Sequence, residues 1–385
     1  MGFLLYALFS LFFISPSVSS SRTLAPEPSK TTVLDVSASI QKTINIFSSN
    51  TKTSLFNQQE KETTSSELTV ELHSRTSLQK TTHTDYKSLT LSRLQRDSAR
   101  VKSLLTRVDL AINSVSASDL KPLETGSEFK SEALQSSVIS GASQGSGEYF
   151  SRVGIGNQRV KLIYLFIGAA GLLGLGGGSL SFPSQINAKS FSYCLVDRDS
   201  ESASTLQFNS TIPPNTVTAP LIKNHQLDTF YYVGLTGLSV GGEQVSIPES
   251  AFQIDESGNG GVIVDSGTAI TRLQTDVYNS LRDAFARGTK DLPSANGITL
   301  FDTCYNLSSR GNVEVPTVSF HFPDGKSLPL PAKNYMVPLD SEGTFCFAFA
   351  PTASSLSIIG NVQQQGTRVV YDLVDSLVGF VPDKC

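Results

Sequence analysis

The stretch Val262-Ile-Val-Asp265-Ser266-Gly267-Thr268 has the residue types of an acid–base site. Asp265 follows three β-branched residues, so its carboxylate is expected at the end of a buried strand. Burying a carboxylate is costly unless hydrogen bonds hold it. The hydroxyls of Ser266 and Thr268 can supply such bonds, and Gly267 lets a backbone amide come close. The alternative is an Asp that caps an ordinary strand-to-turn junction.

The elements that would position this loop are short strands. Strand-like stretches bounded by turn residues lie at 230–240, 243–247, 315–322, 345–350, 357–360 and 367–372. Gly241-Gly242 offers a hairpin turn between the first two. A single helix interrupts this pattern, with Thr275 as its expected cap and Gly288 at its end. Many short strands with one or two helices predict a mainly β fold.

The first twenty residues carry no charge, and 3–14 is apolar apart from Ser10. This pattern predicts a secretory signal peptide over residues 1–20. A buried N-terminal helix is the alternative. A second apolar run, 162–175, is too short to span a membrane comfortably, so no anchor is predicted.

Residues 21–140 differ in composition and charge from the rest of the chain. From 21 to about 84 the chain is rich in Ser and Thr, which predicts little fixed structure. Apolar residues at near-helical spacing then predict a basic amphipathic helix near 91–112. It could be a solvated helix, a membrane-surface helix or part of a removable prosegment. Residues 21–140 carry a net charge of +2 and residues 141–385 carry −6, so the two parts should attract each other.

Cysteine and charge content narrow the function classes. An even number of cysteines in a secreted chain suggests two disulfides, with three pairings possible. The four cysteines are Cys194, Cys304, Cys346 and Cys385. None has metal-ligand spacing, so no metal or cofactor is expected. The net charge of −4 argues against nucleic acid as the main partner. Asn209 and Asn306 begin N-glycosylation sequons.

From about residue 140 onward, the chain resembles the plant nepenthesin-type branch of the pepsin-like aspartic proteases. The resemblance rests on several motifs in the family's order, each weak alone. They lie at 145–150, 168–176, 191–195, 230–235, 261–268, 301–304 and 357–365. The helix near 91–112 resembles the family's prosegment.

The resemblance implies two β lobes that face each other across a cleft. Each lobe gives one Asp, and the two carboxylates share a proton. One carboxylate acts as base on a bound water while the other acts as acid on the scissile carbonyl. Asp265 would be the second-lobe carboxylate. Ser266 and Thr268 would orient it, and Ile358-Ile359-Gly360 would support the loop from below.

The resemblance also implies a disulfide within the second lobe, Cys304 with Cys346. A second disulfide is predicted between Cys194 and Cys385, which would tie the strand at 191–195 to the C-terminus. The resemblance divides the chain into segments with distinct roles. These are a signal peptide (1–20), a prosegment (21–140), a remnant of the first lobe (141–198) and the second lobe (199–385). The protein would enter the secretory pathway, and would be extracellular or retained in the endoplasmic reticulum or vacuole.

One departure from the family pattern concerns the first lobe. Asp265 is the only Asp in the chain that is followed by Ser or Thr and then Gly. Only residues 157–167 stand where the family has its first Asp-Thr-Gly and its flap. The expected fold is therefore an intact second lobe with a truncated first lobe. Hydrophobic surface that would face the missing part should be exposed.

Three functions fit this pattern. The first is an aspartic endopeptidase by descent, made as a secreted zymogen, with protein or peptide substrates and with impaired or absent activity. The second is a protease-like binding or inhibitory protein without catalysis. The third possibility is a homodimer in which each copy lends Asp265. A basic prosegment should leave the acidic mature region as pH falls, if protonation of carboxylates weakens their attraction.

Overall fold

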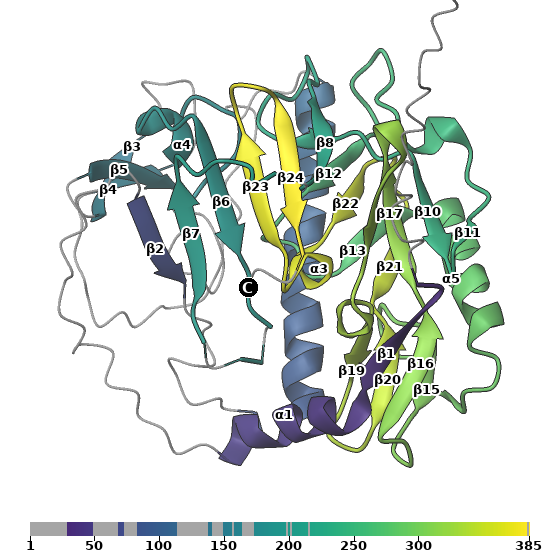
Figure 1. Ribbon diagram of the computed structural model, residues 1–385. Coiled ribbons are helices and arrows are strands. Elements are labelled where there is room, and N and C mark those ends of the chain that lie inside the picture. The colour runs from purple at the N-terminus through teal and green to yellow at the C-terminus, as the bar shows by residue number, and fades with distance from the viewer. Residues whose placement is uncertain are drawn as a thin grey trace, which may run out of the picture.

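The computed structural model describes residues 29–48, 68–72, 83–113, 138–140, 149–155, 158–163, 173–382 (without 198, 201 and 215) and 385. The predicted signal peptide, 1–20, lies outside these residues. The described part of the chain is mainly β, as predicted, and one long helix crosses it (Figure 1).

An eleven-stranded sheet forms the centre of the molecule. Its strands, in spatial order, are β2 (Leu68–Leu72), β7 (Ser204–Phe208), β6 (Ser190–Cys194), β23 (Arg368–Asp372), β24 (Leu377–Val381), β8 (Val217–Ile222), β9 (Tyr232–Val233), β12 (Val262–Val264), β22 (Ser357–Ile359), β13 (Thr271–Gln274) and β21 (Phe349–Thr352). The β6–β7 pair crosses the expected domain boundary at 198/199, so the sheet runs without a break from one proposed lobe into the other.

Smaller sheets surround this one. They are β11 (Glu243–Gln244), β10 (Gly237–Val240), β17 (Val318–Phe322) and β18 (Lys326–Pro329); β14 (Ser294–Ala295), β15 (Cys304–Asn306), β20 (Thr344–Phe347) and β19 (Met336–Pro338); β3 (Val138–Ser140), β4 (Tyr149–Ile155) and β5 (Gln158–Ile163); and β1 (Thr31–Asp35) with β16 (Asn312–Pro316). The helices are α1 (Val36–Ser48), α3 (Tyr86–Ile112), α4 (Phe182–Gln185), α5 (Thr275–Gly288) and α6 (Asn361–Gln364), with 3-10 turns η3 (Glu249–Phe252), η4 (Pro323–Gly325) and η5 (Ala332–Asn334).

The predicted β10–β11 hairpin is confirmed. Gly241 and Gly242 have φ of 62° and 82°, the left-handed conformation that glycine adopts without a side-chain clash. The predicted cap of α5 is wrong, because Thr275 is the first helical residue and Gln274 occupies the cap position. The Thr275 hydroxyl instead donates to the carbonyl oxygen of Thr352, 3.1 Å away, and so ties the helix to β21.

The expectation of little fixed structure over 21–84 is wrong for 31–48 and 68–72. β1 pairs in antiparallel fashion with the edge of β16, and β2 pairs in the same way with β7. Leu34, at the end of β1, is 1% exposed and joins the main hydrophobic cluster. These partners lie far away in the chain, so local composition could not reveal them.

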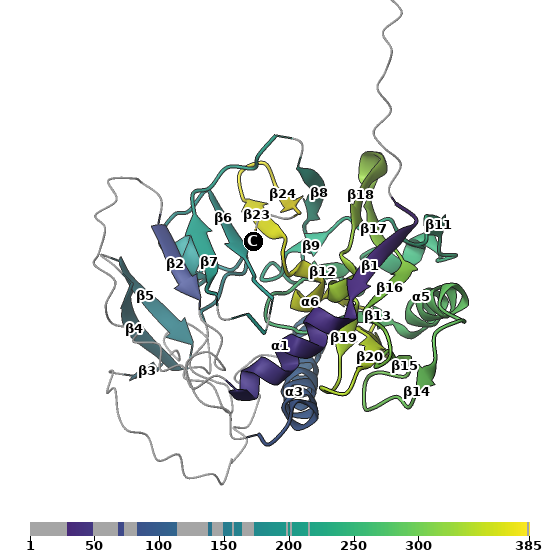
Figure 2. The same ribbon diagram turned by 60° about the horizontal axis from the view of Figure 1, so that its bottom comes forward.

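The basic helix is confirmed, and α3 begins five residues earlier than predicted. Asp85 caps it, and its carboxylate accepts a hydrogen bond from the backbone N–H of Ser88 at 2.7 Å. Figures 1 and 2 show α3 running along the central sheet.

The apolar face of α3 covers the central part of the sheet. Val101 and Leu104 pack in one cluster with Tyr232, Ile263 and Ile358. The expectation that this lobe leaves an exposed hydrophobic face is therefore wrong for these residues.

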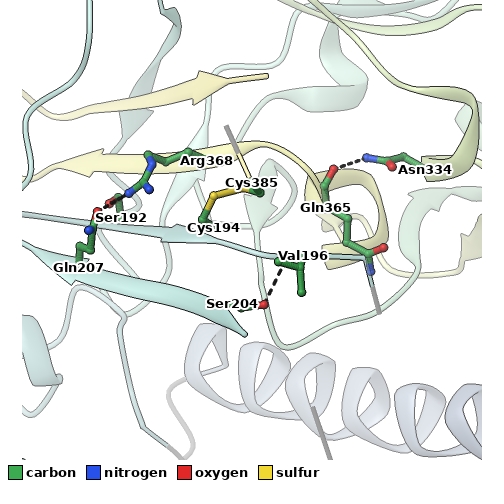
Figure 3. Close-up of a disulfide and its surroundings, with 9 residues drawn as sticks. All are labelled: Ser192, Cys194, Val196, Ser204, Gln207, Asn334, Gln365, Arg368 and Cys385. Carbon is green, nitrogen blue, oxygen red and sulfur yellow. Dashed lines mark hydrogen bonds between the residues drawn. A yellow bond between two sulfur atoms is a disulfide. The ribbon is translucent and has the colours of Figure 1, made fainter. Parts of the chain in front are cut away.

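Two disulfides link distant parts of the chain, and both predicted pairings are confirmed. Cys304 bonds Cys346, which lies directly opposite it across the β15–β20 pair. Cys194 at the end of β6 bonds Cys385, 191 residues later (Figure 3). The second link joins an early strand of the central sheet to the last residue of the chain.

Candidate active site

The loop that carries Asp265 starts at the end of β12. This strand runs parallel to β22, with Val264 opposite Ile359. The backbone N–H of Asp265 donates to the carbonyl oxygen of Ile359 at 3.1 Å, which continues the parallel pairing by one residue. The buried strand pair thus places the carboxylate at the edge of the hydrophobic core.

Two hydrogen bonds orient the Asp265 carboxylate. Oδ1 accepts from the backbone N–H of Gly267 at 3.0 Å, and Oδ2 accepts from the hydroxyl of Thr268 at 2.7 Å. Thr268 is fully buried, so its hydroxyl has one fixed direction. Ser266 is expected to orient the carboxylate through its hydroxyl, but it acts through its backbone instead. Its carbonyl oxygen accepts a hydrogen bond from Asn361 Nδ2 at 2.9 Å, which holds the loop.

Gly360 and its neighbours support the loop from below. The Gly360 N–H donates to Thr271 Oγ1 at 2.9 Å. A Cβ atom at this position would lie 2.6 Å from the carbonyl oxygen of Ala269, so only glycine fits. Asn361 adds a backbone hydrogen bond to the carbonyl oxygen of Thr268 at 2.7 Å. Sequence reasoning missed Asn361 and Thr271, although Asn361 lies inside the matched stretch 357–365.

Arg100 of α3 lies directly on the Asp265 carboxylate. Its Nη2 is 3.2 Å from both Oδ1 and Oδ2. The guanidinium also packs over Gly267, where a Cβ atom would lie only 2.1 Å from Nη2. The two charged side chains are 26% and 18% exposed, so water screens this ion pair only in part. A residue of α3 therefore covers the Asp265 carboxylate.

Asp97 makes a second ion pair one helical turn before Arg100. Its Oδ2 lies 2.7 Å from Arg272 Nη2, and its Oδ1 accepts from the backbone N–H of Ala269 at 2.5 Å. The two charged side chains are 3% and 2% exposed. Burial raises the pKa of Asp97, and the charge of Arg272 opposes that shift in part. Residues 97 and 100 face the same side of α3, so the helix is held by two ion pairs of opposite polarity.

A tyrosine cluster lies within the electrostatic reach of Asp265. The Tyr193 hydroxyl donates to Gln364 Oε1 at 2.5 Å and lies 3.3 Å from the hydroxyl of Tyr371. Burial raises the pKa of both phenols, and the negative charge of Asp265 adds to the shift. Both hydroxyls therefore stay protonated and neutral beneath the site.

The other predicted residues lie elsewhere. Asn209 and Asn306, of the two sequons, are both exposed on the surface. The described residues contain no group of three or more side chains arranged to hold a metal ion. Among these residues there is also no helix with the length and apolar character to cross a membrane. A cavity of about 790 Å³ lies beside η3, lined by residues such as Lys223 and Asp255, and Asp265 is not part of it.

Comparisons with known proteins agree with this geometry. A family model described as "Xylanase inhibitor N-terminal" matches residues 62–210, and one described as "Xylanase inhibitor C-terminal" matches residues 230–382. The solved structure "Crystal structure of edgp" superposes with a TM-score of 0.51 at 22% identity, covering 61% of this chain and 69% of that one. At this identity the likeness shows the fold alone.

Two curated relatives are aspartic proteases. "Protein ASPARTIC PROTEASE IN GUARD CELL 2" of Arabidopsis thaliana is 49% identical over 225 residues, 57% of this chain and 48% of the relative. "Aspartic proteinase nepenthesin-2" of Nepenthes gracilis is 40% identical over 225 residues, 56% of this chain and 50% of the relative. The chain spans about half the length of these relatives. It belongs to the plant nepenthesin-type branch of the pepsin-like aspartic protease family.

Proposed function

We propose that Asp265 is the second-lobe catalytic carboxylate of an aspartic endopeptidase, in a chain that does not hydrolyse peptides by itself. The observation that carries this proposal is the arrangement around Asp265. The buried Thr268 hydroxyl and the Gly267 amide hold the carboxylate in one direction, as a catalytic group requires. A cation, Arg100, lies against the same carboxylate, with its Nη2 3.2 Å from Oδ2.

The chemistry of the family needs a second carboxylate at this position. Two carboxylates can share a proton, so that one removes a proton from water while the other donates one to the carbonyl oxygen. An arginine stays protonated at any pH a protein tolerates, so it can neither accept nor share that proton. Arg100 therefore neutralises Asp265 and cannot replace the missing partner.

The proposed role of α3 is that of an inhibitory prosegment. It belongs to residues 21–140, which the resemblance assigns to a removable part of a secreted zymogen. Its covering of Asp265 supports this assignment. We further propose entry into the secretory pathway, supported by the uncharged residues 1–20 with their apolar run at 3–14 and by the two disulfides. Asn209 and Asn306 would then be glycosylated.

A chimera tests the catalytic assignment. A family-like segment with Asp-Thr-Gly, inserted in place of residues 157–167, should produce peptide hydrolysis at acid pH that a pepstatin-type inhibitor blocks. Asp265→Asn in the same chimera should abolish that hydrolysis, whereas Asp255→Asn, in an exposed loop away from the site, should preserve it. If the chimera cleaves equally well with Asn at position 265, the assignment is wrong.

A non-catalytic binding or inhibitory function is the second candidate. Both matching family models are described as parts of a xylanase inhibitor, and the Asp265 carboxylate is covered. The test is inhibition of a purified xylanase by the full chain. Inhibition that Asp265→Asn leaves unchanged would favour this candidate over the first.

The position of α3 argues against a homodimer in which each copy contributes Asp265. A second copy of Asp265 could approach the first only if Arg100 left the carboxylate and the helix moved away from the sheet. The face that such a dimer needs is filled within a single chain. A dimeric active site would therefore require prior release of α3.

A further inference from the structure

The segment 29–48 binds the rest of the molecule through one strand and one helix. β1 pairs with β16 in antiparallel register from Thr31 opposite Pro316 to Asp35 opposite Asn312. Within the part of the chain that the structure describes, β1 is the only strand that pairs with β16. Figure 2 shows β1 beside β16, with α1 continuing past the end of the pair.

The main-chain hydrogen bonds extend beyond both ends of β1. The carbonyl oxygen of Lys30 accepts from the N–H of Thr317 at 3.0 Å. At the other end, the N–H groups of Val36 and Ser37 donate to the carbonyl oxygen of Gly311 at 3.0 and 3.1 Å. The edge of β16 is thus used along its whole length. Without β1, these backbone groups would form an unpaired strand edge.

Side chains of β1 alternate between the core and the solvent. Leu34 is 1% exposed and Val36 is fully buried, and both join the main hydrophobic cluster. Val33, between Thr32 and Leu34, is 58% exposed. This period of two is how an added strand is recognised, since the backbone supplies affinity and pockets for alternate side chains supply specificity.

The helix that follows adds smaller contacts. Thr43 is fully buried, and its hydroxyl lies 3.0 Å from that of Ser341. Lys42 Nζ pairs with Asp197 at 3.0 Å, but this lysine is half exposed and so contributes little. The strand with Leu34, together with Val36 at the first position of α1, is therefore the main anchor.

We propose that the β16 edge is a strand-binding site whose resident ligand is residues 29–48. The site accepts an extended peptide with an aliphatic residue at the position of Leu34 and a second aliphatic residue two positions later, where the helix begins. The site does not depend on a covalent link to the bound strand. All the described contacts that β1 and α1 make with the rest of the chain are non-covalent, and all of them are made by residues 29–48. A cut after residue 48 would therefore leave this segment bound as a separate peptide. The site is independent of the chemistry proposed for Asp265.

A cleavable full-length chain tests this proposal. A specific protease site is inserted after Asn50, outside the described residues, and the cut protein is passed through a size-exclusion column under native conditions. The fragment should co-elute with the rest of the chain. Leu34→Asp should lower the retained fraction at least tenfold. Val33→Asp, the same change on the exposed face of the same strand, should leave it within twofold.

A second measurement separates loss of binding from loss of folding. Cut Leu34→Asp protein, freed of its own fragment, is mixed with a labelled synthetic peptide of residues 29–48. Uptake of this peptide with a stoichiometry near one, and competition by unlabelled peptide, would support the site. The proposal is overturned if the natural fragment separates after cleavage, if Val33→Asp and Leu34→Asp dissociate alike, or if the freed protein takes up no peptide.

Discussion

At the scale of single residues, two ion pairs, Asp265 with Arg100 and Asp97 with Arg272, join α3 to the loop and the sheet. Asp265 accepts hydrogen bonds from its own loop and pairs with Arg100. Asp97 is buried deeper and pairs with Arg272. Burying such a pair costs free energy, and removing one partner costs more because the other charge stays buried alone.

Asp97→Ala should therefore destabilise the protein strongly. The change leaves Arg272 and the Ala269 N–H without their partner, and we expect a loss of about 3–5 kcal/mol in the free energy of unfolding. Asp109→Ala, at an exposed position of the same helix, should change it by less than about 0.5 kcal/mol. Urea unfolding measures both. The double replacement Asp97→Leu with Arg272→Met should recover much of the loss, and a loss as large as that of Asp97→Ala would contradict this account.

The pH dependence of Asp97 has a defined sign. Burial raises its pKa above the ordinary value of 3.8. The folded protein then holds this proton more firmly than the unfolded chain does, so this group's contribution to stability is present at low pH and is lost as pH rises through the raised pKa.

The free energy of unfolding of the wild type, compared with that of Asp97→Asn across a range of pH, tests the direction of this effect, because the asparagine side chain does not titrate. From pH 3.8 upward, the free energy of unfolding of the wild type should fall relative to that of the variant. Urea titrations at several pH values give the difference. A wild type that gains stability over the variant as pH rises would show that the ionised form of Asp97 is the favoured one.

At the scale of elements, α3 is the structure's main departure from sequence-based expectation. Its position near 91–112 could be predicted from apolar spacing, but its docking partners could not. The helix covers strands β9, β12 and β22, which come from three separate parts of the chain. The residues of α3 that matter most, Asp97 and Arg100, look like ordinary surface charges in the sequence.

The ion pair with Asp265 should hold α3 against proteolysis. Arg100→Glu places two like charges at this contact, so we expect cleavage within 86–112 by an added protease to become several-fold faster. Lys102→Glu makes the same charge change at an exposed position of the helix and should leave the rate close to that of wild type. Equal rates for the two variants would show that Arg100 does not contribute to docking.

The candidate loop itself could be predicted well. The run of β-branched residues before Asp265, and the Gly and Thr that follow it, specify their local structure by type and spacing. Thr268 and Gly360 lie as expected, because short-range rules decide a tight loop. The same reasoning misplaced Thr275 and left 31–48 without structure. In both cases the deciding partner, Thr352 or the β16 edge, is distant in sequence.

At the scale of the whole molecule, two disulfides link segments that lie far apart in the sequence. Cys194–Cys385 closes a loop of 191 residues and Cys304–Cys346 a loop of 42. Replacing Cys194 and Cys385 by serine should cost about 2–5 kcal/mol in the free energy of unfolding. The longer loop should cost about 1 kcal/mol more than the shorter one, if loop entropy dominates. Urea unfolding of the two serine pairs gives this order, and the reverse order would contradict it.

The chain as a whole combines one catalytic-type carboxylate with a helix that covers it. We propose that Asp265 has no partner carboxylate among the described residues and that the chain does not cleave peptides by itself. The most direct measurement is peptide hydrolysis by the purified chain at acid pH, with and without a pepstatin-type inhibitor, beside Asp265→Asn. We expect equal background rates for the chain and the variant, insensitive to the inhibitor. Inhibitor-sensitive cleavage that disappears in Asp265→Asn would contradict the claim, and would show that two copies of this chain build a working dyad.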